Sequence, residues 1–362
     1  NFNTGFSFFK WNEEKGKSTS INSNFNYGLE DDRLRVSGNL FHRFNRQNFA
    51  NISVSGGVTV EQFNNSEPIS KFVNSISTLF FRNNFMKIYE KKFAQAFYGQ
   101  EVTNGLYMSG GLIYEKRKAL LNTTDFSIVK SSDLYTSNDP LQPFNFTSTP
   151  FNEHHIIKGR ISGRIRFGQK YISRPDGKIT LRDDDYPTLF FNYEKAFAAT
   201  NNNYKFDLVT ASMTYNKTIG NKGNFSSMIR SGKFFNAANI AFVDYQHFNG
   251  NQTHFNLFDR RINSFSLLPY YSNSTNDAFV ELHAEHNFKG YVMNKIPLLN
   301  KLQWNLVGGF HQINVPNLKP YQEFSVGFDN IGFGKLRFLR VDYVRSYQNG
   351  FQGDGFMFGL KF

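Results

Sequence analysis

Cysteine is absent from the 362 residues of the chain. Without thiols the protein has no disulfide scaffold, no zinc site built from thiolates and no cysteine nucleophile. Long apolar runs are absent as well, since no stretch of about 18 apolar residues occurs, and the mean hydropathy is -0.48. A bundle of membrane-spanning helices is therefore excluded.

Phenylalanine, by contrast, is abundant, with 43 residues, and aromatic residues make up 17% of the chain. Such a chain either buries its aromatics in a soluble core or exposes them to lipid while its polar residues face a lumen. The formal net charge of +12 favours anionic surroundings such as nucleic acid, acidic headgroups or lipopolysaccharide phosphates, or serves solubility alone. Because no basic helix, basic stripe or nucleic-acid module occurs, we expect outer-membrane lipid and lipopolysaccharide as partners and no nucleic acid.

The local pattern decides between a soluble core and a lumen. Apolar and polar residues alternate with period two in segments of about ten residues, as in membrane-spanning strands. A soluble sandwich shows similar alternation, but its strands are shorter. Every second residue of the final segment is large and apolar: Phe356, Phe358, Leu360 and Phe362. We expect Phe356, Phe358 and Phe362 to form the C-terminal signal that the cell's own barrel insertase recognises.

We expect fifteen strands, at residues 2–11, 18–29, 33–46, 50–62, 90–101, 104–117, 153–168, 185–197, 203–218, 223–232, 277–288, 301–313, 319–329, 335–346 and 354–362. The predicted fold class is all-β, a transmembrane antiparallel β-barrel of about 16 strands that comprises residues 1–362. Since single-chain bacterial barrels have even strand numbers, either 239–248 is a sixteenth strand or a first strand before Asn1 is missing. We favour the missing strand. No signal peptide is visible, so we interpret the chain as a fragment.

Strand direction predicts the orientation in the bacterial outer membrane. If the C-terminus is periplasmic and strands alternate, the long connections 63–89, 118–152 and 233–276 are extracellular. Connection 233–276 is too apolar for a freely solvated loop, so we expect it to fold into the lumen. There its Arg260 and Arg261 would reach carboxylates.

Two further connections, 69–80 and 292–302, have apolar residues at helical spacing. Neither is long enough to cross a membrane. We expect both to pack against the rim of the barrel.

Four segments of the C-terminal third carry a family resemblance: 266–271 (SLLPYY), 294–299 (NKIPLL), 321–330 (YQEFSVGFDN) and 339–347 (LRVDYVRSY). Together they resemble a Bacteroidota family of outer-membrane barrels of unassigned function. Its members commonly carry an N-terminal carboxypeptidase-regulatory-like domain, which this sequence does not contain.

The barrel of that family is in turn similar to the superfamily of barrel-assembly insertases and two-partner-secretion transporters, which have sixteen strands and a long sixth extracellular loop. The similarity implies a role in outer-membrane protein assembly or protein transport. It also implies other outer-membrane or periplasmic proteins as partners, with a barrel-assembly complex among them. Five predicted strands follow connection 233–276, as five follow the sixth loop there. The Arg-Gly-aromatic tip of that loop is replaced here by Asp259, Arg260 and Arg261.

Charged side chains on the predicted lumen face are the candidate functional residues. The basic ones are Arg33, Arg35, Arg43, Lys158, Arg160, Arg164 and Arg166. They form either an anion path or ion pairs with lumen carboxylates, of which Glu61, Glu115, Glu194 and Glu323 are examples, and we favour the ion pairs.

Glu281, His283 and Glu285 share one strand face, where we favour a polar lumen lining over a zinc or calcium site. The acidic run 183–185 is interpreted as solvated. Because no catalytic triad, phosphate-binding loop or metalloprotease motif occurs, we expect a protein that is no enzyme and holds no cofactor or metal. A passive pore and an anchor for a missing periplasmic domain stay open as alternative functions.

Overall fold

The computed structural model describes residues 2–14, 16–29, 31–123, 125–129, 134–175, 177–181, 185–253, 255–257 and 262–360. The predicted roles of Arg260, Arg261 and Phe362 therefore fall outside the described residues, as does most of the acidic run 183–185. In the described part of the chain, no helix combines the length and the apolarity that crossing a bilayer requires.

Strands dominate the described residues. Fifteen of them pair in chain order along one antiparallel sheet: β1 (Phe2–Asn12), β2 (Lys17–Gly28), β3 (Arg33–Arg43), β4 (Asn51–Gln62), β5 (Ile88–Thr103), β6 (Leu106–Ala119), β7 (His154–Arg166), β10 (Thr188–Ala199), β11 (Phe206–Thr218), β12 (Asn224–Phe235), β14 (Ala278–Asn287), β15 (Asn305–Asn314), β16 (Tyr321–Phe333), β17 (Leu336–Tyr347) and β18 (Phe351–Leu360). The predicted all-β class is confirmed, and each predicted strand is present close to its expected bounds.

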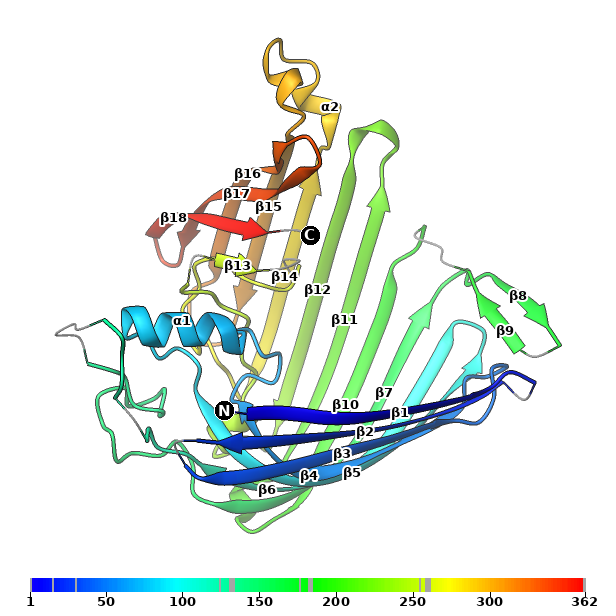
Figure 1. Cartoon of the computed structure of the whole chain (residues 1–362), viewed down its shortest axis with the longest axis vertical. Coiled ribbons are helices and arrows are strands. Elements are labelled where there is room, and N and C mark those ends of the chain that lie inside the picture. Colours follow the sequence, from blue (N-terminus) through cyan, green and yellow to red (C-terminus); the bar gives the residue numbers. More distant parts are fainter. Residues whose placement is uncertain are drawn as a thin grey trace.

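The sheet curls strongly: in Figure 1 the first strands, β1 and β2, lie nearly horizontal, whereas β11, β12 and β14 run steeply upward. A short strand, β13 (Phe255–Leu257), pairs in parallel with the free edge of β18. Between β1 and β18 the described residues form no pairing. The long connections 63–87, 120–153 and 236–277 leave from one end of the sheet, which we call the long-loop end. The opposite end, with turns such as 104–105 and 334–335, we call the short-turn end.

The two faces of the sheet differ as the period-two alternation predicts. In β16, Glu323 is 0% exposed while its neighbour Phe324 is 49% exposed. Val326, Phe356 and Phe358 are exposed on the same outer face as Phe324. Phe328 is half-buried. Successive side chains point to opposite sides of a strand, so these exposed apolar residues lie on the outer face of the sheet and Glu323 lies on its inner face.

The alternative sixteenth strand at 239–248 is wrong. This segment contains a 3-10 turn, η3 (Phe242–Asp244), and its apolar residues pack together against the inner face of the sheet. Alternation of apolar and polar residues predicts a strand only where one face is buried and the other is exposed. Here the apolar residues are enclosed from several sides, so their alternation does not indicate a strand.

Helices occur only as short pieces in the described residues. The helical spacing in 69–80 is confirmed by α1 (Lys71–Phe81), which begins where the Ser70 hydroxyl caps the Val73 amide at 3.2 Å. The segment 292–302 includes the end of α2 (Gly290–Met293) and the whole of η4 (Leu299–Leu302), and Pro297 lies between the two. Single turns η1 (Asn202–Tyr204) and η2 (Gly220–Lys222) join further strands. Connection 167–187 contains an unpredicted hairpin, β8 (Tyr171–Arg174) and β9 (Gly177–Thr180).

Candidate functional site inside the curled sheet

Residues 236–277 join β12 to β14, and we call them the inner connection; their described part lies on the concave side of the sheet (Figure 1). Many apolar side chains of the inner connection are almost fully buried, although its described residues form no long helix or strand. Phe248, Phe265 and Leu268 are each 1% exposed. A segment with so little regular structure is buried only if the surrounding strands supply both apolar contacts and hydrogen-bond partners.

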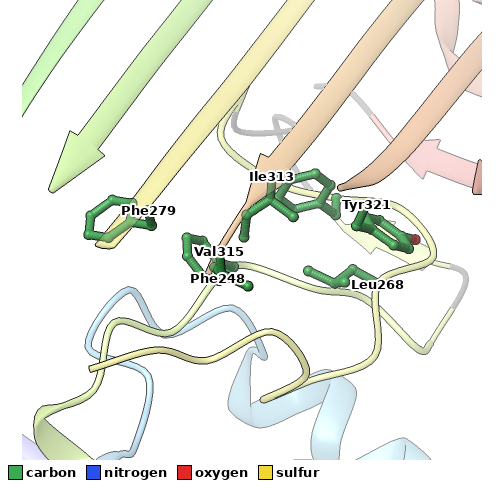
Figure 2. Packing of buried hydrophobic residues seen from close by; sticks show 7 residues of the cluster. Phe248, Leu268, Phe279, Ile313, Val315 and Tyr321 are labelled. Carbon is green, nitrogen blue, oxygen red and sulfur yellow. The ribbon is translucent and has the colours of Figure 1, made fainter. Parts of the chain in front are cut away.

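One apolar cluster holds the C-terminal half of the inner connection. Its seven residues are Phe248, Phe265, Leu268, Phe279, Ile313, Val315 and Tyr321. Figure 2 shows that Phe279, Ile313 and Tyr321 come from the ends of β14, β15 and β16 and face the connection. Burying one large apolar side chain stabilises a fold by about 1.5–3 kcal/mol, so this cluster alone fixes the connection to three strands.

Two more clusters hold the N-terminal half of the inner connection. Ala241, Phe242 and Val243 pack with buried aromatics that come from the other side of the curl: Phe63, Tyr89 and Phe151. Ala237 and Ile240 pack against a third set, drawn from β7, β10, β11 and β12: Ile156, Ala196, Phe206 and Phe234. The inner connection therefore touches strands around most of the curl near the long-loop end.

A buried ion pair fixes the middle of the inner connection. Asp244, at the end of η3, accepts two hydrogen bonds from Arg117 of β6, at 2.5 and 2.9 Å. Both side chains are 3% exposed. Arg117 also donates to Glu115 at 2.8 Å, and Lys158 of β7 lies 3.8 Å from Asp244. The two-pronged geometry of guanidinium and carboxylate gives strength and direction to this contact.

The network of ion pairs around Asp244 extends along the inner face of the sheet. Lys158 lies 3.2 Å from Glu194 of β10, which also pairs with Arg160. Lys91 of β5 lies 2.6 Å from Glu61. Opposite charges thus alternate across the inner face of neighbouring strands, as buried charges must to offset the loss of water. The predicted pairing holds for Lys158 and Arg160.

A second polar anchor is Glu323 of β16. Its carboxylate accepts hydrogen bonds from the backbone amides of Ser266, Leu267 and Leu268, at 2.7, 2.8 and 3.1 Å. The hydroxyl of Tyr321 donates to the same carboxylate at 2.8 Å. The predicted lumen carboxylate therefore binds the backbone of the inner connection, where a basic side chain was expected as its partner.

Glu281 and His283 of β14 are buried on the inner face of the sheet. Arg230 donates to Glu281 at 2.8 Å, and His283 Nε2 contacts the other oxygen of Glu281 at 2.9 Å. His283 Nδ1 lies 2.8 Å from His311 Nδ1, so one of these two nitrogens carries the shared proton. The ring of Phe265 covers His283 at 4.7 Å between centroids.

Glu285, the third member of this predicted face, binds Arg340 of β17 at 2.7 and 3.1 Å. Side chains on one strand face thus meet different partners from neighbouring strands. Within the described ranges, no three His, Cys, Asp or Glu residues are placed to hold a metal ion.

The buried His247 gives the inner connection a titratable group of its own. Its ring contacts the Ser274 hydroxyl at 2.8 Å and the Phe242 carbonyl at 3.0 Å. Burial lowers the pKa of His247 to about 4. The imidazole is therefore neutral at physiological pH.

The remaining predicted basic residues fall into two groups. Arg35 lies 3.0 Å from Glu90, and Arg33 lies 3.6 Å from it, so both are paired. Arg43, Arg164 and Arg166 have no carboxylate partner among the described residues, and all three line a cavity of about 430 Å³ at the short-turn end. Asp244 and Arg117 were missed in the sequence, although the alternation places Arg117 beside Glu115 on the predicted lumen face.

A family model described as "Family of unknown function (DUF5686) C-terminal domain" matches residues 1–328. No curated protein matches the chain. Among solved structures, BamA from Haemophilus ducreyi lacking POTRA domains 1-3 is 9% identical, with a TM-score of 0.48, 98% of this chain covered and 66% of that chain. CdiB from Acinetobacter baumannii is 10% identical, with a TM-score of 0.42 and coverage of 94% and 53%.

The CymD monoaromatic hydrocarbon channel is 9% identical, with a TM-score of 0.24, 96% of this chain covered and 82% of that chain. The chain thus spans just under two thirds of the BamA chain and about half of the CdiB chain.

Proposed function

The chain belongs to the DUF5686 C-terminal domain family, whose function is unknown, and we propose that it is a non-enzymatic outer-membrane barrel that serves protein assembly or transport. In this proposal it works as a subunit of a larger envelope complex, with its C-terminus in the periplasm. The observation that carries the proposal is the inner connection, which is fixed inside the curl by Asp244, Glu323 and three apolar clusters.

The outer face of the sheet supports the membrane location. Exposed large apolar residues such as Val280, Phe324 and Phe356 lie on strands whose other face is charged. Exposing apolar surface to water costs about 25 cal/mol per Å², whereas lipid accommodates it without that cost. The same alternation of an apolar outside with a polar inside characterises barrels in the outer membrane.

The buried inner connection supports an assembly or transport role over a passive pore. A passive pore needs a continuous water path along its lumen. Here the connection contacts strands from β5 round to β16 near the long-loop end, which obstructs such a path. The sequence resemblance to insertases and two-partner-secretion transporters also favours a folded-in loop followed by five strands, the arrangement that the chain has in β14 to β18.

Depletion of the full-length protein in its native host tests the proposed function. We expect the abundance of a defined subset of other outer-membrane proteins to fall, as measured by quantitative mass spectrometry of purified outer membranes, while uptake of small solutes stays unchanged. An unchanged outer-membrane proteome together with altered solute uptake would instead establish the passive pore. Chemical cross-linking in the same cells should recover envelope proteins bound to the wild-type chain.

The absence of native cysteine allows a sharper test of whether the inner connection must move. The side-chain amide of Asn64 donates to Asn249 Oδ1 of the inner connection at 3.3 Å, so a short bis-methanethiosulfonate reagent can join Asn64→Cys to Asn249→Cys through reducible bonds. We expect the cross-linked double variant to lose the effect on client proteins and reduction to restore it, with each single variant as control. Full function in the cross-linked state would show that a fixed connection suffices.

A further inference from the structure

The cavity at the short-turn end, which we call the arginine cavity, lies away from the contacts of the inner connection. Arg43 at the end of β3 and Arg164 and Arg166 near the end of β7 supply its charge. The other lining residues come from β3 to β6 and from the β7–β10 connection: Phe41, Phe49, Asn51, Glu101, Gly105, Tyr107, Gln169 and Thr180. The β8–β9 hairpin is fixed over this region by a hydrogen bond from the Lys178 amide to the Arg46 carbonyl at 3.1 Å.

Among the described residues, carboxylates do not balance the charges of the arginine cavity. Glu101 is its one lining carboxylate, and that side chain is already engaged by the Lys178 ammonium and the Gly105 amide. Arg43, Arg164 and Arg166 have no ion-pair partner within the described part of the chain, and Arg43 Nε is buried without a hydrogen bond. Elsewhere in the described part of the inner face, several arginines do contact carboxylates, namely Arg35, Arg117, Arg160, Arg230 and Arg340. A buried donor without an acceptor is unfavourable, so this cavity is suited to an anion from outside the chain.

The geometry favours a tetrahedral oxyanion. Arg164 and Arg166 are two residues apart on one strand face, which places their backbones about 6.6 Å apart, and Arg43 approaches from β3. The guanidinium of Arg164 lies 5.4 Å from the centre of the Tyr107 ring, and that of Arg43 lies 5.9 Å from Phe41. These aromatic contacts limit the motion of the arginine heads. Asn51 donates to the Tyr107 hydroxyl at 2.9 Å, which leaves the proton of that hydroxyl for a further acceptor.

We propose that the arginine cavity binds a phosphorylated anion. Arginine forks match phosphate oxygens in pairs, and about 430 Å³ accommodates a pyrophosphate or a phosphorylated sugar but not a whole lipid. The phosphate belongs either to a small soluble molecule or to a membrane headgroup whose acyl chains stay outside. The site is independent of the proposed transport role, because it uses none of the contacts that hold the inner connection.

Arginine-specific labelling of the purified wild-type chain with phenylglyoxal tests the site without a variant. Mass spectrometry then maps labelling at Arg164 and Arg166, with the exposed Arg174 of β8 as internal control. In one arm, the detergent-solubilised protein is titrated with inorganic pyrophosphate. In the other, the protein is reconstituted in phosphatidylcholine vesicles with or without phosphatidic acid. We expect protection of Arg164 and Arg166, and none of Arg174, in at least one arm.

Protection by pyrophosphate identifies a soluble ligand, and protection by phosphatidic acid alone identifies a headgroup. The arm that shows protection is repeated as a binding titration with variants. We expect Arg164→Gln and Arg43→Gln to weaken binding at least tenfold and the charge-matched Arg174→Gln to change it less than twofold. Heat-modifiable migration in gels verifies that each variant is folded. Absent protection in both arms, equal protection of Arg174, or unchanged affinity in the folded triple variant R43Q/R164Q/R166Q would overturn the proposal.

Discussion

On the inner face of the sheet, Arg117 at the long-loop end has carboxylate partners, whereas the arginines of the arginine cavity at the short-turn end lack them among the described residues. At the long-loop end, Arg117 is fully buried and bound by Glu115 and Asp244, so its charge is used to hold the inner connection. At the short-turn end, Arg43 and Arg164 are left without carboxylates in the described part of the chain. The difference shows that arginines on the inner face fall into two groups. The paired ones hold the structure together, and the unpaired ones are those that we propose bind an anion.

The largest effect should follow from breaking the buried pair at the long-loop end. Arg117→Ala leaves Asp244 buried without its main partner, which typically costs about 3–5 kcal/mol. Urea unfolding of the protein refolded into lipid vesicles, followed by tryptophan fluorescence, measures this loss. The control is Lys195→Ala, which removes the exposed pair with Asp207 and should have a much smaller effect. Equal losses in the two variants would show that burial of the Arg117 pair is unimportant.

A charge on the outer face should produce the next largest effect. Val326 is 51% exposed near the middle of β16, and an arginine at the bilayer midplane costs about 2–4 kcal/mol. Val326→Arg should therefore lower the free energy of unfolding in vesicles. Leu336→Arg, at the strand end beside the short turn, is the matched control and should cost about 0–1 kcal/mol. If Val326→Arg is as stable as the wild type, this face does not contact lipid.

Acid should weaken the inner connection through His247. Its pKa is about 4 in the folded protein and about 6.5 in the unfolded chain, so the unfolded state binds more protons between these values. The stabilisation, at most about 3 kcal/mol, is complete above pH 6.5 and is lost as the pH falls towards 4. Unfolding measured from pH 7 to pH 4 should show this slope. The variant His247→Gln should lack that part of the slope, and an identical pH dependence in both proteins would exclude His247 as its source.

The smallest of these effects is expected at Glu323. Glu323→Gln keeps one carbonyl acceptor for the amides of 266–268 but removes the charge, and hydrogen bonds to a charged group are worth about 1.5–3 kcal/mol. We expect a loss within that range and faster hydrogen exchange at the Ser266, Leu267 and Leu268 amides. Glu61→Gln, whose partner is Lys91, is the control that should leave those three amides unchanged. Unchanged exchange in Glu323→Gln would contradict the anchoring role.

The same comparison shows what the sequence could predict. Strands followed from a period of two, and α1 followed from apolar residues at helical spacing, because both signals are local. The pairing of Arg35 but not Arg43 could not be predicted, although both lie on one face of β3. Arg35 pairs with Asp31, four residues before it, and with Glu90 of β5, whose position depends on the register of strands distant in sequence.

The inner connection shows the same limit at longer range. Its apolar content predicted that it would pack somewhere, yet Asp244 and Arg117 are separated by 127 positions. No local pattern marks such a pair. The carboxylate of Glu323 was expected to pair with a basic side chain, whereas it accepts hydrogen bonds from the backbone amides of residues 266–268. Every residue except proline has a backbone amide, so residue type does not reveal which amides a buried carboxylate will bind. Such partners cannot be predicted from a single sequence.

Single-channel recording in planar lipid bilayers tests most directly whether the inner connection closes the interior. We expect the purified wild-type chain to insert with no steady ohmic conductance, because the connection is fixed at the long-loop end. The folded variant Asp244→Ala, which releases the connection from Arg117 and Lys158, should open frequently. A steady conductance of equal size in the wild type and in Asp244→Ala would contradict the account and identify a passive pore.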